Sequence, residues 1–419
     1  MNKIIQSLKH INWDFSDYNS SKYPLDINSI PWYPATFPTP IPKYLISLLS
    51  SDHELVLDPF GGKGTTAIEA IKQNRYTIYN DINPFANDIV KSLIASIKHI
   101  SLNDSIIDNI IIHDKIKLNH LHRIDNNIIY NSENAQDSIR YSRLISCLEE
   151  YPEINISQET ILWYHIDTLL ELIEIKKLII ESNEDEYLIR KVALISILKE
   201  TSSQRGHFTY VTDNCKPKTL KYYNAIDSYL NMLNRLNLAV KDYLRQFFTI
   251  NKTENLLEVI NNTIIHQGDA RKLSWISSNS IDLVITSPPY LCAQDYTKTM
   301  RLVNFFFPND NFLEIAKNEI GPRSQRRGKS EIVVSTFYND MKSVFSDVYR
   351  VLKKDKYFCL IIGQGKGKVT QPYDTILDLK NILTNELNFS LIYSTQRNIS
   401  HKAIRIGGVE NEDIIILKK

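Results

Sequence analysis

The sequence predicts a doubly wound α/β fold, in which a mostly parallel sheet is covered by helices and interrupted by a mainly helical insertion. Short apolar runs alternate with segments of helical periodicity near both ends of the chain, and a glycine-rich turn joins the first run to a helix. A long middle stretch lacks this alternation. We therefore expect one α/β domain formed by residues 1–98 and 262–419, with residues 99–261 inserted into it as a helical region.

The elements of the first part follow the order of a doubly wound sheet. A proline-rich stretch over 31–42 is expected to run extended, and apolar residues at helical spacing over 41–49 predict an amphipathic helix. After these come the strand ELVLDPF, which GGKGTT ends, the helix TAIEAIKQN, the strand RYTIYND and the helix PFANDIVKSLIASIKH.

The middle stretch, from about 100 to 260, predicts helices such as ETILWYHIDTLLELIEIKKLII and LIRKVALISILKE. The alternation then resumes. We expect strands at NTIIHQGDA and IDLVITS, a helix around 338–352, a strand at KYFCLIIG, a helix around 373–386, and strands at FSLIYST and EDIIILKK. Because the last two strands are close in sequence, they are expected to pair as an antiparallel hairpin.

Composition narrows the class of protein. The chain has 419 residues, of which 43% are hydrophobic and 23% charged, so it can form a substantial core. The net charge of +1 excludes a uniformly basic surface but leaves room for local basic patches. The four cysteines are far apart and the ten histidines form no ligand pattern, which disfavours a zinc site or metal-activated hydrolysis. No signal peptide or membrane span is expected, and a reducing cytoplasm fits best.

The segment LDPFGGKGTTAIEA places three glycines between a predicted strand and a predicted helix. Gly62, Gly64 and Ala67 match the dinucleotide fingerprint GxGxxG/A, whose glycines let a ligand approach the backbone at a helix N-terminus. Asp81 ends the next strand, where a carboxylate can accept hydrogen bonds from two ribose hydroxyls. Lys63 is followed by glycine, so the spacing of a phosphate-binding P-loop fails. These residues alone leave both a nicotinamide dinucleotide and S-adenosylmethionine open.

The segment TSPPY (286–290) ends a predicted buried strand with two prolines, which cannot donate to a sheet. With DPFGGKGTT upstream, the chain resembles the amino-methyltransferases of DNA, which methylate an exocyclic base nitrogen. More narrowly, SPPY resembles the cytosine-N4 group, because the adenine-N6 enzymes usually carry Asp or Asn before the prolines. The resemblance covers roughly 30–95 and 263–419 and includes YPATFP (33–38), YNDINPFA (79–86) and QGDA (267–270).

This resemblance implies the class I S-adenosylmethionine methyltransferase fold, that cofactor, and double-stranded DNA as the substrate. It also implies N4-methylcytosine as the product and a cognate restriction endonuclease as the partner in a restriction–modification system. Asp58 would contact the amino end of the cofactor, Asp81 the ribose and Asp269 the adenine amino group. The full set of cofactor residues implied by the resemblance is Thr36, Phe37, Asp58, Phe60, Gly61, Gly62, Gly64, Thr65, Thr66, Asp81, Ile82, Asp269 and Ala270.

The double-proline segment suits the chemistry of an amino group. The lone pair of an exocyclic base nitrogen is delocalised into the ring, so the enzyme must accept hydrogen bonds from both N–H groups to make it nucleophilic. The Ser287 hydroxyl and the Pro288 carbonyl are two such acceptors, and Pro289 helps to fix their direction. Tyr290 offers a face on which an extracted base can stack. Cys292 is interpreted as structural, since cytosine-C5 enzymes carry a Pro-Cys pair that is absent here.

Two basic stretches are candidates for DNA contact. The segment GPRSQRRGKS (321–330) follows the double-proline segment closely, and its glycines and proline predict a loop that tracks phosphates. The stretch 202–223 interleaves basic and aromatic residues, so the insertion is expected to hold much of the target recognition. The residues concerned are Arg205, Lys216 and Lys218 in the insertion, and Arg323, Arg326, Arg327 and Lys329 in the later segment.

Three alternatives remain open from the sequence. One is adenine-N6 methylation of DNA by the same segment, because a single serine is thin evidence for the identity of the base. Another is RNA methylation, since tRNA guanine methyltransferases share a similar glycine loop and double proline, usually with Asp in the Ser287 position. The third is a catalytically silent nucleic-acid-binding protein, against which the intact glycine loop, Asp81 and SPPY argue.

Overall fold

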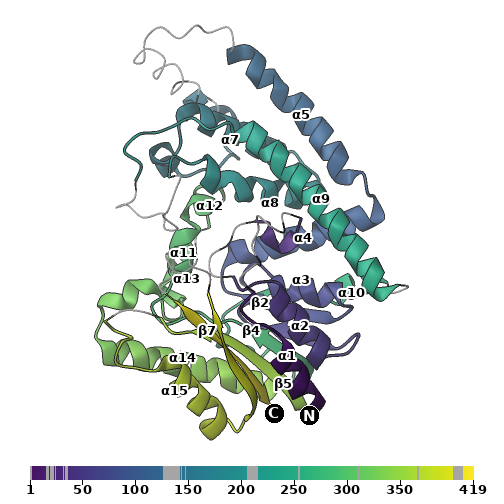
Figure 1. Ribbon diagram of the computed structural model, residues 1–419. Coiled ribbons are helices and arrows are strands. Elements are labelled where there is room, and N and C mark those ends of the chain that lie inside the picture. The colour runs from purple at the N-terminus through teal and green to yellow at the C-terminus, as the bar shows by residue number, and fades with distance from the viewer. Residues whose placement is uncertain are drawn as a thin grey trace.

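The computed structural model describes residues 2–15, 18, 23, 25–31, 33, 36–125, 142, 144–146, 148–204, 216–252, 255–309, 311–365, 368–399 and 409–419. Within them one seven-stranded sheet has the order β3-β2-β1-β4-β5-β7-β6 (Figure 1). Strands β1 to β5 pair in parallel, and β7 runs antiparallel to both of its neighbours. The predicted α/β class with a mostly parallel sheet is confirmed.

The strands begin and end close to the apolar runs that predicted them. Strand β4 is buried at every position, as its uninterrupted run IDLVIT suggests for the centre of a parallel sheet. The expected antiparallel pairing of β6 with β7 is present, and β7 also pairs with β5. The bounds are β1 Leu55–Asp58, β2 Tyr76–Asp81, β3 Ile264–Gln267, β4 Ile281–Thr286, β5 Leu352–Gly363, β6 Ser390–Asn398 and β7 Asn411–Lys418.

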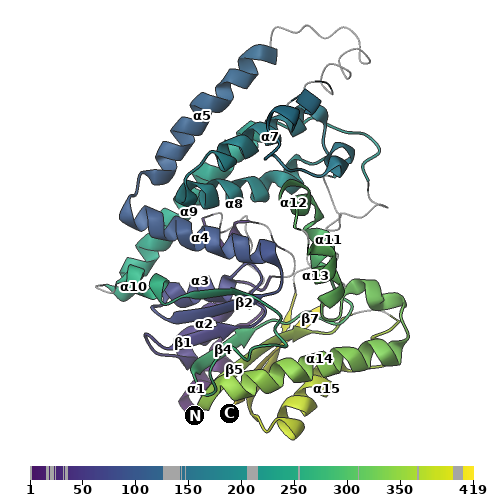
Figure 2. The same ribbon diagram turned by 180° about the vertical axis from the view of Figure 1, so that it is seen from behind.

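Helices cover both faces of the sheet because successive strand residues point to opposite sides. On one face α1 (Asn2–His10) and α2 (Pro40–Leu49) pack on a core that includes Val56 and Leu283. On the other face α14 (Ser330–Val351) and α15 (Thr375–Asn381) pack on the neighbouring residues Leu57 and Val284. Figures 1 and 2 show these two layers from opposite sides. A π-helical turn, η5 (Ile382–Glu386), continues α15.

The inserted helices extend from the edge of this α/β unit. Their core is continuous with α3 (Thr65–Lys72) and α4 (Pro84–Leu102), so α4 joins the helical region to the sheet. In Figure 1 this region lies above the sheet. Its members are α5 (Ile106–Asp125), η2 (Gln158–Leu162), α7 (Ile166–Ile180), α8 (Glu184–Thr201), α9 (Ala225–Asn251) and α10 (Leu256–Asn261).

Two helix boundaries differ from the sequence prediction. The segment ETILWYH was expected to begin a long helix, but α7 begins only at Ile166, because the His165 side chain caps it by accepting from the Asp167 N–H. Helix α14 begins at Ser330, eight residues before the expected start, because Val333, Val334 and Phe337 continue its buried face toward the N-terminus.

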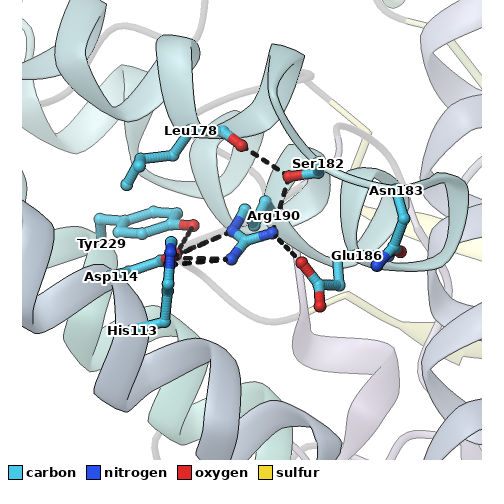
Figure 3. A network of polar contacts seen from close by, with 8 residues as sticks. All are labelled: His113, Asp114, Leu178, Ser182, Asn183, Glu186, Arg190 and Tyr229. Atoms are coloured by element: carbon cyan, nitrogen blue, oxygen red, sulfur yellow. Dashed lines mark hydrogen bonds and ion pairs between the residues drawn. The ribbon is translucent and has the colours of Figure 1, made fainter.

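A buried ion pair holds three inserted helices together (Figure 3). Arg190 of α8 donates two hydrogen bonds to Asp114 of α5, from Nε at 3.0 Å and from Nη2 at 2.8 Å. Tyr229 of α9 donates to the same carboxylate at 2.9 Å. Asp114 is 0% exposed and Arg190 3% exposed, so each charge depends on the other for its stability in the interior.

Candidate active site

A cavity opens where the chain leaves the carboxyl ends of β1, β2, β3 and β4. The order of the sheet reverses between β1 and β4, and ligands of open α/β sheets bind outside such a reversal. About 890 Å³ there is free of protein atoms, part of it open to solvent. The predicted site residues that line this cavity are Thr36, Phe37, Phe60, Gly61, Gly62, Thr65, Asp81, Ile82, Asp269, Ala270, Ser287 and Pro289.

The remaining predicted residues of the site are not in the cavity wall. Asp58, Gly64, Thr66, Pro288 and Tyr290 lie next to lining residues in sequence and support them from behind. Conversely, the wall includes residues that sequence reasoning did not select. These are Tyr33, Pro59, Lys63, Asn83, Tyr296, Thr297, Ile315, Asn318, Glu319 and Ile320.

The glycine loop between β1 and α3 needs its glycines for two different reasons. A Cβ on Gly61 would lie 2.2 Å from the ring of Tyr79, and a Cβ on Gly64 would lie 2.5 Å from Val90. Gly62 and Gly64 also have positive φ angles of 52° and 85°. The loop thereby packs closely on β2 and α4 and brings its backbone to the N-terminus of α3, as the fingerprint predicted.

Asp81 fastens this loop to the end of β2. Its Oδ2 accepts from the Gly62 N–H at 2.8 Å, and its Oδ1 accepts from the Asn83 N–H at 2.8 Å. Burial raises the pKa of Asp81 to about 6, although both backbone hydrogen bonds oppose that rise. Each oxygen keeps a further lone pair for a ligand hydroxyl.

Asp58 links the two motifs that the sequence pointed to. Its carboxylate accepts from Thr66 of α3 at 2.7 Å and from Thr286, the last residue of β4, at 2.6 Å. The Phe60 N–H donates to it as well, at 3.1 Å. Burial raises its pKa to about 6. Asp58 thus sets the distance between the glycine loop and the double-proline segment, and its predicted contact with the cofactor stays a prediction.

Lys63 contributes a buried positive charge to the cavity. Its side chain is 8% exposed, and no hydrogen bond or ion pair of its ammonium group is found within the described part of the chain. Burial lowers its pKa to about 8, with Asp26 opposing and Arg235 adding to the effect. Keeping this charge buried is costly, so an anion bound in the cavity would stabilise it.

The double-proline segment is anchored through Tyr290. Strand β4 ends at Thr286, and the Ser287 hydroxyl lies 3.1 Å from the Tyr290 hydroxyl. Tyr290 donates in turn to Glu412 Oε1 at 2.8 Å, and Arg397 pairs with the other oxygen of Glu412. Burial, and next the charge of Glu412, raise the pKa of Tyr290 well above its ordinary value.

A carboxyl group that the sequence did not point to, Glu319, lies in the same wall as Ser287. It accepts from both the N–H and the hydroxyl of Thr297. Burial raises its pKa to about 7, so it can gain or lose a proton near neutrality. It follows α13 (Phe312–Asn318), and Thr297 belongs to α11 (Tyr296–Thr299). These short helices carried no motif or long periodicity by which they could have been found.

Asp269 lies in the wall with part of its hydrogen-bonding capacity already used. Burial tends to raise its pKa, but the hydrogen bonds that Arg271 donates from its backbone N–H and its guanidinium outweigh burial, and the pKa is lowered. Arg271 also pairs with Asp340 of α14 at 2.9 Å. The carboxylate is therefore held ionised and in a fixed direction.

The basic segment differs from its prediction as a loop. Arg323–Arg327 form a 3₁₀ helix, η4, because Pro322 leads into a turn that Gly328 ends. The helix η4 begins three residues after Ile320 of the cavity wall. Arg327 and Lys329 are exposed, and Arg323 is partly exposed. Lys216 and Lys218 are exposed in an irregular segment before α9, whereas Arg205 and the side chain of Arg326 lie outside the described residues.

Two further features concern metal binding and membrane insertion by the described residues. No group of three or more His, Cys, Asp or Glu side chains in them could hold a metal ion. In the same residues no helix combines the length and apolar character that crossing a bilayer requires.

The fold is that of open α/β proteins, which bind nucleotide-type ligands outside the reversal of their sheet, where the cavity lies. The particular class follows from comparison with known proteins. The family model described as DNA methylase, of the N6 and N4 type, matches residues 5–92 and 281–405, just over half of the chain. The chain belongs to this family and is a DNA methyltransferase.

Individual relatives are more distant. The chain is 24% identical over 411 residues to the type II methyltransferase M.MvaI of Kocuria varians, covering 88% of this chain and 83% of that one. It is 28% identical over 133 residues to the type II methyltransferase M.MjaI of Methanocaldococcus jannaschii, covering 31% and 42%. Among solved structures, the rRNA methyltransferase aviRa of Streptomyces viridochromogenes aligns at 10% identity over 97% of this chain and 96% of that one. Its TM-score of 0.36 is too low to argue from.

The cofactor is S-adenosylmethionine. The cavity offers what such a ligand requires: a carboxylate at the end of β2, a buried cation at Lys63, and apolar walls that include Phe37, Ile82 and Ile315.

Proposed function

We propose that this protein methylates the exocyclic N4 of cytosine in duplex DNA, within a restriction–modification system. The observation that carries the proposal is Ser287, a hydroxyl in the cavity wall at the end of β4, where the adenine-N6 group usually has an acid or an amide. The names of M.MvaI and M.MjaI as type II methyltransferases support the assignment to a restriction–modification system.

The cofactor residues divide by the part of the ligand that each would hold. Asp81 would accept hydrogen bonds from the ribose hydroxyls. Asp269 and Ala270 would lie beside the adenine ring, at the end that carries its amino group. Lys63 pairs with the carboxylate of the methionine end, over which Phe37 closes. Each assignment pairs a charge or polar group of the wall with its complement on the ligand.

When bound, S-adenosylmethionine supplies an activated methyl group. The chain's own task is to make the amino nitrogen of the base nucleophilic and to hold it in line. The Ser287 hydroxyl and the Pro288 carbonyl would accept from its two N–H groups, and the Tyr290 ring would offer a stacking face to the extracted base. The nitrogen must lose one proton as it gains the methyl group, and Glu319 is the carboxylate in the same wall that takes it up.

DNA would reach this site from the side of the basic segment. The segment follows the cavity wall in sequence and carries four positively charged residues. These would attract the phosphates that flank an extracted base. They are Arg323, Arg326, Arg327 and Lys329. Residues 99–261, with Arg205, Lys216 and Lys218, supply target recognition.

Nucleoside analysis tests the proposal. Mixed DNA is incubated with the protein and cofactor, digested, and the modified nucleoside is identified by mass; N4-methylcytosine is the expected product. N6-methyladenine alone would overturn the choice of base and leave the reaction class intact. Ser287→Ala should lower turnover by about one to three orders of magnitude with little change in cofactor affinity. Cys292→Ser should remain active, because Cys292 is fully buried.

A further inference from the structure

The Ser287 hydroxyl is the outer end of a chain of hydrogen bonds that reaches into the sheet. It runs from Ser287 to the Tyr290 hydroxyl, from there to Glu412 of β7, and ends at Arg397 of β6. Glu412 is 8% exposed and Arg397 is 5% exposed. The inner half of the chain is therefore shielded from water, and its hydrogen-bond directions are set by the protein.

The register of the sheet fixes the inner members. Glu412 pairs with Arg397 on one side and with Gly363 of β5 on the other. A Cβ on Gly363 would lie 2.9 Å from Cε2 of the Tyr290 ring, so the glycine allows the tyrosine to lie against β5. The hydroxyl of Tyr290 is thereby held over the carboxylate of Glu412.

Counting donors along this chain gives each hydrogen bond one direction. Arg397 can only donate and a carboxylate can only accept, so the Tyr290 hydroxyl uses its single O–H to donate a hydrogen bond to Glu412. Burial raises the pKa of Tyr290, so that proton stays on the phenol. The Tyr290 oxygen must then accept from Ser287. The proton of Ser287 is used inward, and only its lone pairs face the cavity.

We propose that Tyr290 and Glu412 are positioning residues that hold the Ser287 hydroxyl as an acceptor, so that the site selects a base with an exocyclic amino group over its deaminated, keto counterpart. The inference rests on the proposed role of Ser287 as a contact to the base. It holds for an amino group on cytosine or on adenine, so it does not depend on which base is modified.

Glu412→Gln reverses the direction of the hydrogen bonds that link position 412 to Ser287, while it keeps the size of the side chain. Because Arg397 only donates, the amide oxygen must face Arg397 and the amide NH₂ must face Tyr290. The phenol then donates to Ser287, and the Ser287 proton turns toward the base. We expect kcat to fall at least about tenfold with the dissociation constant for cofactor unchanged. Asp413→Asn is the matched control, since Asp413 is a buried neighbour on β7 that pairs with Lys380 instead.

Tyr290→Phe interrupts the chain rather than reversing it. The Ser287 hydroxyl would then rotate freely, so the loss of kcat should be smaller than in Glu412→Gln. A purely structural role predicts the opposite order, because the amide conserves the packing of the carboxylate. Tyr338→Phe removes another tyrosine–carboxylate hydrogen bond, to Asp378, and should leave kcat unchanged.

Binding separates this inference from the proposed function. Fluorescence anisotropy with S-adenosylhomocysteine present compares a duplex carrying the target base with one carrying its deaminated form, uracil for cytosine or hypoxanthine for adenine. The wild type should prefer the amino base by about tenfold or more, and Glu412→Gln should lose that preference. Asp413→Asn should keep it.

The outcomes are distinct. Wild-type preference and wild-type kcat in Glu412→Gln would overturn the inference, and so would an equal loss in Asp413→Asn. If Glu412→Gln does not fold, Tyr290→Phe decides alone: an unchanged preference overturns the inference and a reduced one supports it. A wild-type protein that methylates no exocyclic amino group would instead refute the proposed function.

Discussion

Replacing Lys63 by methionine should make the cofactor-free protein more stable while weakening its hold on the cofactor. Burial lowers the Lys63 pKa from 10.5 to about 8. At about 1.4 kcal/mol for each unit, the charge destabilises the folded state by roughly 3 kcal/mol. The sign follows from the two pKa values. Below pH 8 the lysine is charged in both states and the full cost is present, whereas between pH 8 and 10.5 the folded protein releases its proton first and the cost disappears.

Chemical denaturation and calorimetry measure the two effects. Lys63→Met should gain up to about 3 kcal/mol of unfolding free energy at pH 7 and little above pH 10. Its affinity for S-adenosylmethionine should fall by about 1.5–3 kcal/mol, the scale of a charged hydrogen bond. Wild-type affinity should also decline as pH rises through 8. The α-amino group of the ligand titrates in the same range, so Lys63→Met supplies the baseline to subtract.

Lys72→Met is the matched control, because Lys72 is equally buried but pairs with Glu69. That variant should lose stability, since it leaves a buried carboxylate without its partner, and it should bind cofactor normally. If Lys63→Met is destabilised in the same way and keeps its cofactor affinity, Lys63 does not await an anion and the reasoning fails.

Three further predictions concern the ribose contact, the DNA contact and the inserted helices. Asp81→Ala should weaken cofactor binding by about 1.5–3 kcal/mol in calorimetry. An unchanged affinity would show that the end of β2 does not hold the ribose. Arg323→Ala and Arg327→Ala should each weaken binding equally for specific and unrelated duplexes, and each should flatten the plot of log affinity against log salt by about 0.9. A salt slope unchanged in the double variant would leave the segment as a solvated surface. Arg190→Met should cost about 3–5 kcal/mol of unfolding free energy by removing the guanidinium that faces the buried carboxylate of Asp114, and adding Asp114→Leu should recover part of it, as melting curves would show.

The sequence predicted those parts of the site whose geometry is local. The glycine loop, Asp81 and Ser287 each sit at the end of a strand, and the ends of neighbouring parallel strands meet at one edge of a sheet. Short motifs in that context therefore predicted most of the cavity wall. Lys63 belonged to the same loop, but its burial arises only on folding, which also brings the charges of Asp26 and Arg235 close enough to act on its pKa.

The parts that were not predicted depend on contacts between distant residues. Glu412 lies 122 positions from Tyr290, and no motif marks it. Glu319 lies among short helices whose apolar residues follow no sustained period. The antiparallel hairpin of β6 and β7 could be predicted from their nearness in sequence. Which of the two lies beside β5 was not predicted; the structure places the buried strand β7 between β5 and β6, and β6, largely exposed, forms the edge of the sheet.

The place of β7 in the sheet has a consequence for biosynthesis. The ribosome delivers β6 before β7, yet β7 occupies the position between β5 and β6. While β7 is still in the exit tunnel, β6 has no neighbour in the sheet, and Tyr290 has no carboxylate to accept its hydrogen bond. We therefore expect a growing chain that already contains both motifs to methylate DNA more slowly than the folded protein, until β7 has emerged and Glu412 has joined the sheet.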